Sequence, residues 1–271
     1  MIRADATTAA LIFTGEMYGV QVDQLAGLLE MTPRRAAAVV ARWQAAGSAD
    51  AAALGPGPRW VWLTKAGLAR CGLPYSAAVP GLSRLAHLRA VTAVRLALMA
   101  LPDYQAAGAH WRSERRIRTR IGGRIGLREH VPDGEVHWPD NAVVAWAGEC
   151  WAIEAELTPK TAARTAAIMR ELLTRTGEYG CPAAQVRVPG RPPRHARAIY
   201  LCSPAARPVV TKTRDALGSR LAERIEIRLL PPGAELAAVP SPAPVRSSGG
   251  ARSSGGARSA AGAGATGAAG Q

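Results

Sequence analysis

The run Cys150-Trp151-Ala152-Ile153-Glu154-Ala155-Glu156-Leu157 alternates strictly between two sets of side chains. One set is apolar and consists of Trp151, Ile153, Ala155 and Leu157. The other set includes two carboxylates, Glu154 and Glu156. Successive side chains of a β-strand point to opposite faces, so the pattern predicts a strand with one face in a core. The two carboxylates would lie side by side on the second face and repel each other, unless a cation or a shared proton offsets their charge.

A third carboxylate lies upstream, in the turn sequence Pro-Asp-Gly that holds Asp133. This turn precedes a second strand-like run over residues 135–138. If the two strands pair, Asp133 joins Glu154 and Glu156, and the three supply the hard oxygen ligands that Mg²⁺ or Mn²⁺ requires. Lys160 follows closely and would bring a positive charge to the same place. The sequence therefore predicts a divalent metal site formed by Asp133, Glu154 and Glu156.

This order of residues, an Asp, then Glu-x-Glu at a strand end, then a Lys, resembles the PD-(D/E)xK nuclease superfamily. Over roughly residues 7–230 the chain also resembles the replication-relaxation family of actinobacterial plasmids and integrative elements, in which a winged helix precedes a nuclease-like domain. The stretches that carry the resemblance are Trp111-Arg-Ser-Glu-Arg115, His130-Val-Pro-Asp-Gly134 and Ile153-Glu-Ala-Glu-Leu-Thr-Pro-Lys160.

The resemblance implies catalytic roles for Asp133, Glu154, Glu156 and Lys160. It adds Glu114, because a Glu that precedes the Asp often completes the metal site in these families. The alternative role of Glu114 is an ion pair with one of the arginines at 115, 116 and 118. The third motif position is normally Lys and is Glu156 here. The implied enzyme is a Mg²⁺-dependent DNA endonuclease, and this departure leaves an inactive site open as the alternative.

The whole chain is strongly basic, with a net charge of +14 and a pI near 10.8, which favours an anionic partner and nucleic acid first. The acidic residues concentrate in residues 131–180, so a basic chain surrounds one acidic segment. The four cysteines form no Cys-x-x-Cys pair and have no zinc spacing with His, which indicates reduced thiols of a cytoplasmic protein. Neither a signal peptide nor an apolar run of ~18 residues is visible, so we expect no membrane association.

The N-terminal segment has the pattern of a winged helix-turn-helix. Helices are predicted over residues 7–18 and Val22–Leu29. A third runs to about Ala46, with Thr32 as its N-cap and Pro at its first position. The apolar segment 60–63, which follows a Gly- and Pro-rich stretch, predicts a wing hairpin. The residues expected to contact duplex DNA are Arg34, Arg35, Arg42 and Arg59. The alternative is a small helical domain used for dimerisation.

Four segments are expected along the chain. Residues 1–72 form the winged helix-turn-helix, 73–81 a linker, 82–230 the PD-(D/E)xK-like domain, and 231–271 a disordered tail rich in Arg, Gly, Ser and Ala. The fold class is α/β (α+β), with a mixed sheet and helices on both faces. A helix over 82–101 would direct Arg84, Arg89 and Arg95 to solvent or DNA. A helix after Lys160 would point Ala163, Ala167, Leu172 and Leu173 inward, and further strands are expected at 198–202 and 225–230.

Two functions remain open from the sequence. The first is a DNA-binding protein of a plasmid or integrative element that acts in replication and relaxation, with a metal-dependent nuclease-like domain. The second is a non-catalytic winged-helix regulator of replication or transcription with a degenerate nuclease fold. The expected partners are double-stranded DNA, a second copy of the chain, and replication or transfer proteins of the element. The expected cofactor of an active enzyme is Mg²⁺ or Mn²⁺.

Overall fold

Helix α3 (Pro33–Ala45) begins and ends where the sequence predicts. The Thr32 hydroxyl accepts a hydrogen bond from the Arg35 N–H at 3.4 Å, and Pro33 occupies the first turn, where its missing N–H costs nothing. Gly47, with φ of 66°, follows the helix end. The buried residues of α3 are Ala36, Val39, Val40 and Trp43, which helical periodicity places on one face.

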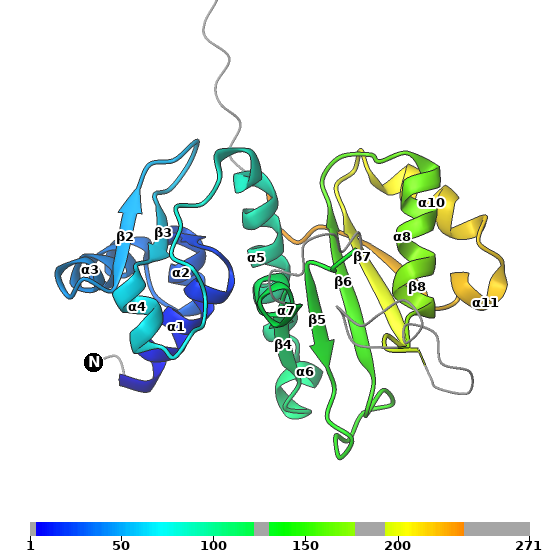
Figure 1. Ribbon diagram of the computed structural model, residues 1–271, viewed down its shortest axis with the longest axis horizontal. Coiled ribbons are helices and arrows are strands. Elements are labelled where there is room, and N and C mark those ends of the chain that lie inside the picture. Colours follow the sequence, from blue (N-terminus) through cyan, green and yellow to red (C-terminus); the bar gives the residue numbers. More distant parts are fainter. Residues whose placement is uncertain (1–3, 122–129, 177–192, 236–271) are drawn as a thin grey trace, which may run out of the picture. The chain divides into compact units, whose positions relative to one another are not determined.

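The computed structural model describes residues 4–121, 130–176 and 193–235. The elements before residue 71 are α1 (Ala4–Glu16), β1 (Val20–Gln21), α2 (Val22–Leu28), α3, β2 (Ala49–Ala52), β3 (Trp60–Leu63) and α4 (Lys65–Arg70) (Figure 1). Strand β3 pairs antiparallel with β1 and β2 in the order β1-β3-β2, and Asp50 lies opposite Trp62. The predicted hairpin is therefore present, and residues 73–81 contain no helix or strand.

A larger mixed sheet follows in the chain. Its elements are η1 (Leu82–Arg84), α5 (Leu85–Met99), α6 (Pro102–Ala106), β4 (His110–Ser113), α7 (Glu114–Ile121), β5 (Gly134–His137), β6 (Cys150–Glu156), α8 (Ala162–Thr174), β7 (Arg197–Cys202), α10 (Arg207–Asp215), α11 (Ser219–Ala222) and β8 (Ile225–Leu229). The strand order is β4-β5-β6-β7-β8. Strands β4, β5 and β6 form an antiparallel meander, and β6, β7 and β8 are parallel. The predicted α/β class with a mixed sheet is confirmed, although the sequence did not predict β4.

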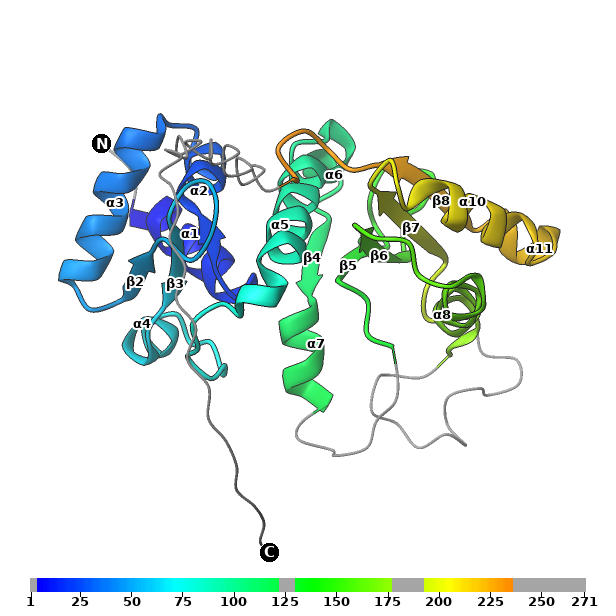
Figure 2. The same cartoon turned by 90° about the horizontal axis from the view of Figure 1, so that it is seen from above.

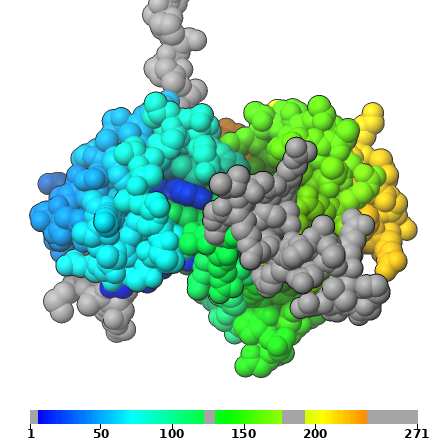
Figure 3. Space-filling view, viewed as in Figure 1, coloured from blue at the N-terminus to red at the C-terminus, as the bar shows by residue number. Residues whose placement is uncertain are grey.

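Helices cover both faces of this sheet (Figure 2). Helix α5 packs on the face that holds Ile153 and Ala155. Helices α8 and α10 pack on the other face, around Ala152 and Tyr200, and their surfaces adjoin in light green and yellow in Figure 3. The predicted core face of β6 is therefore present, and its other face is buried as well, which the alternation did not predict. The reason is that α8 covers the face with Glu154, which is only 2% exposed.

Two helical faces differ from the expectation. In α8 the residues Ala163 and Ala167 are exposed, and the buried side chains include Ile168 and Met169 beside Leu172 and Leu173. Burying Ile and Met removes more apolar surface from water than burying two Ala, so the helix turns the larger side chains to the sheet.

In α5 the residues Arg89 and Arg95 are each 8% exposed and do not face solvent. Arg89 donates to the Asp23 carboxylate at 2.8 Å, and Arg95 lies 3.1 Å from Glu16. These acidic partners belong to α2 and α1, so α5 buries its arginines against the N-terminal helices. Arg84 stays partly exposed and pairs with Glu114 at 2.9 Å.

The chain after β8 packs on the folded part for five residues more than expected. Ala234 is 1% exposed and belongs to the core, and the Glu235 carbonyl accepts a hydrogen bond from Arg89 at 2.9 Å. The predicted tail therefore does not begin at Pro231, because residues 231–235 are held in place, and residues 236–271 lie outside the described residues. Among the described helices, none has both the length and the apolar character needed to cross a membrane.

Candidate functional site

Three of the four predicted DNA contacts share the outer face of α3. The side chains of Arg34, Arg35 and Arg42 are exposed, and Arg35 and Arg42 line one shallow surface groove with Ala38. Arg59 is exposed beside β3, and its guanidinium donates to the Ala51 carbonyl across the hairpin at 2.6 Å. The helix thus presents three positive charges on a rigid element, because its opposite face is fixed in the core.

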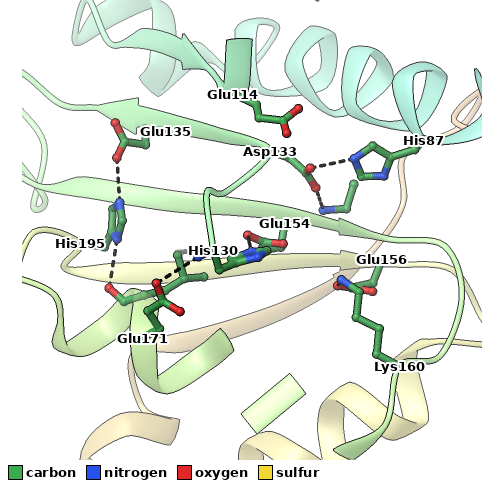
Figure 4. A network of polar contacts seen from close by, with 12 residues as sticks. His87, Glu114, His130, Asp133, Glu135, Glu154, Glu156, Lys160, Glu171 and His195 are labelled. Atoms are coloured by element: carbon green, nitrogen blue, oxygen red, sulfur yellow. Dashed lines mark hydrogen bonds and ion pairs between the residues drawn. The ribbon is translucent and has the colours of Figure 1, made fainter. Parts of the chain in front are cut away.

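The predicted acidic residues gather at one end of the β5–β6 pair (Figure 4). Asp133 comes directly before β5, whose first residue, Gly134, lies opposite Ile153 of β6. Glu154 and Glu156 follow along β6, 2% and 4% exposed. These two glutamates therefore do not lie on a solvated strand face. The strand pairing that the sequence required to bring Asp133 beside Glu154 is present.

Two contacts hold the Asp133 carboxylate. One oxygen lies 2.7 Å from Nε2 of His87 on α5, and the other accepts the Ala155 N–H at 2.8 Å. Burial by itself would raise the pKa of this carboxyl, but the hydrogen bond and charge of His87 oppose it, and the net effect lowers the pKa of Asp133. The same contact raises the pKa of the His87 imidazole, against the effect of its own burial. Each member of the Asp133–His87 pair therefore favours the charged form of the other.

Glu154 has a different electrostatic environment. Its Oε1 lies 2.7 Å from Nε2 of His130, so this histidine has the structural partner that a lone His usually has. Burial raises the pKa of Glu154; His130 works in the opposite direction, and the charge of Asp133 adds to the increase. The buried hydroxyl of Tyr200, opposite Glu154 on β7, makes no hydrogen bond to the described residues. Burial is therefore the largest cause of the raised pKa of Glu154, and a cation bound nearby would lower this pKa.

Lys160 and Glu114 lie at the edges of the carboxylate cluster. The Lys160 ammonium forms an ion pair with Glu156, so it does bring its charge to the carboxylates. Glu114 pairs with Arg118 at 2.6 Å, which is one of the ion pairs proposed as its alternative role, and also with Arg84. Its N–H donates to the Asp133 carbonyl, and its side chain lines a small cavity with His87 and Asp133.

The carboxylates do not converge as tightly as the sequence suggested. Among the described residues, the potential metal ligands whose ligand atoms all lie within 4.8 Å of one another are Glu135, Cys150 and His195. This group does not include the three predicted carboxylates. Asp133, Glu154 and Glu156 each contact a separate basic side chain instead. The sequence missed His87 and Tyr200 because they lie far from the motif along the chain and come next to it only through α5 and β7.

Part of the quoted motif has a packing role. A Cβ atom added to Gly134 would lie 1.9 Å from the indole ring of Trp111, far inside van der Waals contact. The stretches 111–115 and 130–134 therefore meet across the β4–β5 pair, and only Gly fits at this point. The Gly of the Pro-Asp-Gly turn thus sets the close approach that positions Asp133.

The comparisons with known proteins add little. The sequence matches no protein-family model, and the comparison with curated proteins gives no match either. Among solved structures the chain is similar to PigF with SAH, at 16% sequence identity and a TM-score of 0.18, over 84% of this chain and 62% of that chain. This chain spans less than two thirds of that protein's length, and so low a TM-score carries no argument about function.

Proposed function

We propose that this chain is a DNA-binding protein that contacts duplex DNA with α3 and the β2–β3 hairpin. The observation that carries the proposal is the set of three exposed arginines, Arg34, Arg35 and Arg42, on the outer face of a capped helix. The order of helices and strands around it, with the hairpin after α3, is the one expected of a winged helix. The net charge of +14 supports a polyanionic partner.

DNA binding is tested with the double variant Arg35→Ala, Arg42→Ala. Each lost phosphate contact should lower the slope of log affinity against log salt by about 0.9, so we expect a loss of roughly two units together with weaker binding. The matched control is Arg220→Ala, Arg228→Ala, which removes the same charge from exposed positions on α11 and β8. Equal losses in the two double variants would contradict specific contact by α3.

For the sheet part we propose a nuclease-like domain that binds Mg²⁺ or Mn²⁺ through Asp133, Glu154 and Glu156, with Lys160 at its edge. The metal would polarise the scissile phosphate and lower the pKa of an attacking water when bound. The support is positional: an Asp lies directly before one strand, and two buried Glu lie on the next strand. The assignment to replication of a plasmid or integrative element rests on the sequence resemblance.

A non-catalytic DNA-binding regulator is the second candidate, and one observation favours it. Each carboxylate already has a basic partner within the protein, namely His87, His130 and Lys160 for Asp133, Glu154 and Glu156 respectively. Incubating supercoiled and linear DNA with the protein, with and without Mg²⁺ or Mn²⁺, separates the two. Cleavage that Asp133→Asn abolishes supports the nuclease. If the DNA stays intact in all samples and calorimetry detects no heat of binding at millimolar metal, the result supports the non-catalytic regulator.

A further inference from the structure

A second cluster of polar side chains lies at the opposite end of the β5–β6 pair from Asp133. It contains Glu135 of β5, Cys150 at the start of β6, and His195 just before β7. Glu135 and His195 are each 0% exposed, and Cys150 is half-buried. One carboxylate oxygen, the thiol sulfur and one imidazole nitrogen lie within 4.8 Å of one another. These three donors come from three segments of the chain, so no zinc-like spacing is visible in the sequence.

The geometry of His195 is that of a metal-binding imidazole. Its Nδ1 lies 3.0 Å from the Leu172 carbonyl, which can only accept a hydrogen bond, so Nδ1 carries a proton. Its Nε2 then faces Glu135 Oε1 at 2.8 Å (Figure 4). In metal sites a ligating histidine almost always donates its second nitrogen to a carbonyl or carboxylate in this way, which fixes the ring and the tautomer.

A fourth donor is close. His137 Nε2 lies 3.1 Å from Glu135 Oε2 and 3.7 Å from the Cys150 sulfur. Two ligand atoms on one tetrahedral zinc ion are separated by roughly 3.3–3.8 Å, given zinc bond lengths of about 2.0–2.3 Å. The two distances from His137 are therefore close to the spacing that such an ion imposes, and His137 is the fourth candidate ligand beside the three donors that lie within 4.8 Å of one another.

The contacts of Glu135 show where an ion would enter, which is in place of its hydrogen bonds with the two histidines. Arg194 donates to both of its oxygens, at 2.8 and 2.9 Å, and Arg112 lies 3.4 Å away. A carboxylate has about four acceptor directions, so Arg194 uses one on each oxygen and the histidines face the others. Hydrogen bonds of this kind to a ligating carboxylate are usual around metal sites and orient the ligand.

We propose that Glu135, Cys150 and His195, with His137 as the fourth ligand, bind a borderline-soft divalent cation, best represented by Zn²⁺. Thiolate and imidazole donors select such an ion over Mg²⁺, which prefers oxygen alone. Zinc binding displaces the thiol proton of Cys150 and the Nε2 proton that His195 directs at Glu135, so two protons leave as one divalent ion enters. Neutral His137 offers its Nε2 to the ion when its proton moves from Nε2 to Nδ1. The bound ion ties β5, β6 and the start of β7 together and stabilises the sheet.

The test is a zinc titration of the full chain after chelator treatment, in competition with a chromophoric chelator, followed by cobalt substitution. We expect one zinc per chain and a thiolate-to-cobalt charge-transfer absorption band. Cys150→Ser should remove this band, and His195→Gln should weaken zinc binding by more than about tenfold, since even the outer partners of a ligand are worth about 10–100-fold. Cys71→Ser, which changes a half-buried thiol at the end of α4, is the matched control and should keep the band.

Two results would overturn the proposal: no stoichiometric zinc binding by the wild-type chain, or a cobalt band that survives in Cys150→Ser. If His195→Gln does not fold, Cys150→Ser still decides, because a change of sulfur to oxygen at a half-buried position perturbs packing little. The variant Asp133→Asn should leave zinc binding unchanged. The outcome is therefore independent of whether the other end of the sheet binds Mg²⁺.

Discussion

Glu16 on α1 should be essential for stability because it is the acidic partner of a buried arginine on α5. Its Oε2 lies 3.1 Å from Nη1 of Arg95, and the two residues are 5% and 8% exposed. The Arg95 guanidinium also lies 4.2 Å from the centre of the Phe13 ring. Burial lowers the pKa of Arg95 and Glu16 opposes this effect, yet an arginine remains charged in a protein. Removing the charge of Glu16 therefore leaves a cation without its carboxylate.

We expect Glu16→Gln to lower the free energy of unfolding by about 3–5 kcal/mol, the usual cost of removing one partner of a buried ion pair. At roughly 2–4 °C per kcal/mol for a folded part of this size, the melting temperature should fall by roughly 6–20 °C. Urea denaturation of the full chain measures the first quantity and thermal unfolding the second. The matched control is Glu226→Gln, whose pair with Arg228 is 43% and 49% exposed and should contribute less than about 1 kcal/mol.

The double variant Glu16→Gln, Arg95→Met separates charge from packing. Met fills a similar volume, keeps contact with the Phe13 ring and needs no counter-charge, so most of the lost stability should return. In a double-mutant cycle, the coupling energy of the two substitutions should then have the opposite sign to the stability change that Glu16→Gln causes by itself. If Glu16→Gln costs no more than Glu226→Gln, or if the double variant is less stable than Glu16→Gln, the pair is not electrostatically coupled and the reasoning fails.

Two further predictions concern the C-terminal boundary and the candidate metal site. A chain cut after Glu235 should keep the melting temperature of the full chain, whereas a cut after Leu230 should lower it, because it removes the buried Ala234; thermal unfolding of both truncations checks this. The pKa of Glu154 is raised in the folded state, so as the pH rises the unfolded chain loses the carboxyl proton before the folded chain does. The free energy of unfolding should therefore fall as the pH rises above about 4.3. Glu154→Gln should remove that decline, stabilise the metal-free protein at neutral pH and abolish any shift of the melting temperature with Mg²⁺; a steeper decline in the variant than in the wild type would contradict the assignment.

Local signals in the sequence determined much of the chain's organisation. The Thr32 cap, the Pro after it and the spacing of four apolar residues are sufficient to define α3 and the face that exposes Arg35 and Arg42. These interactions act within a few residues, so they can be recognised without a partner. The alternation of β6 and the turn before β5 likewise predicted a strand pair that places Asp133 near Glu154.

The environment of these residues was decided only by tertiary structure. Whether the Glu154 face of β6 meets solvent depends on α8, which lies farther along the chain, and the partner of Asp133 is a histidine 46 residues upstream. The burial of Arg95 depends in the same way on Glu16 of α1. Burial and charge pairing arise between segments that meet only after the chain folds. Periodicity can therefore assign a side chain to a face, but it carries no information about what covers that face.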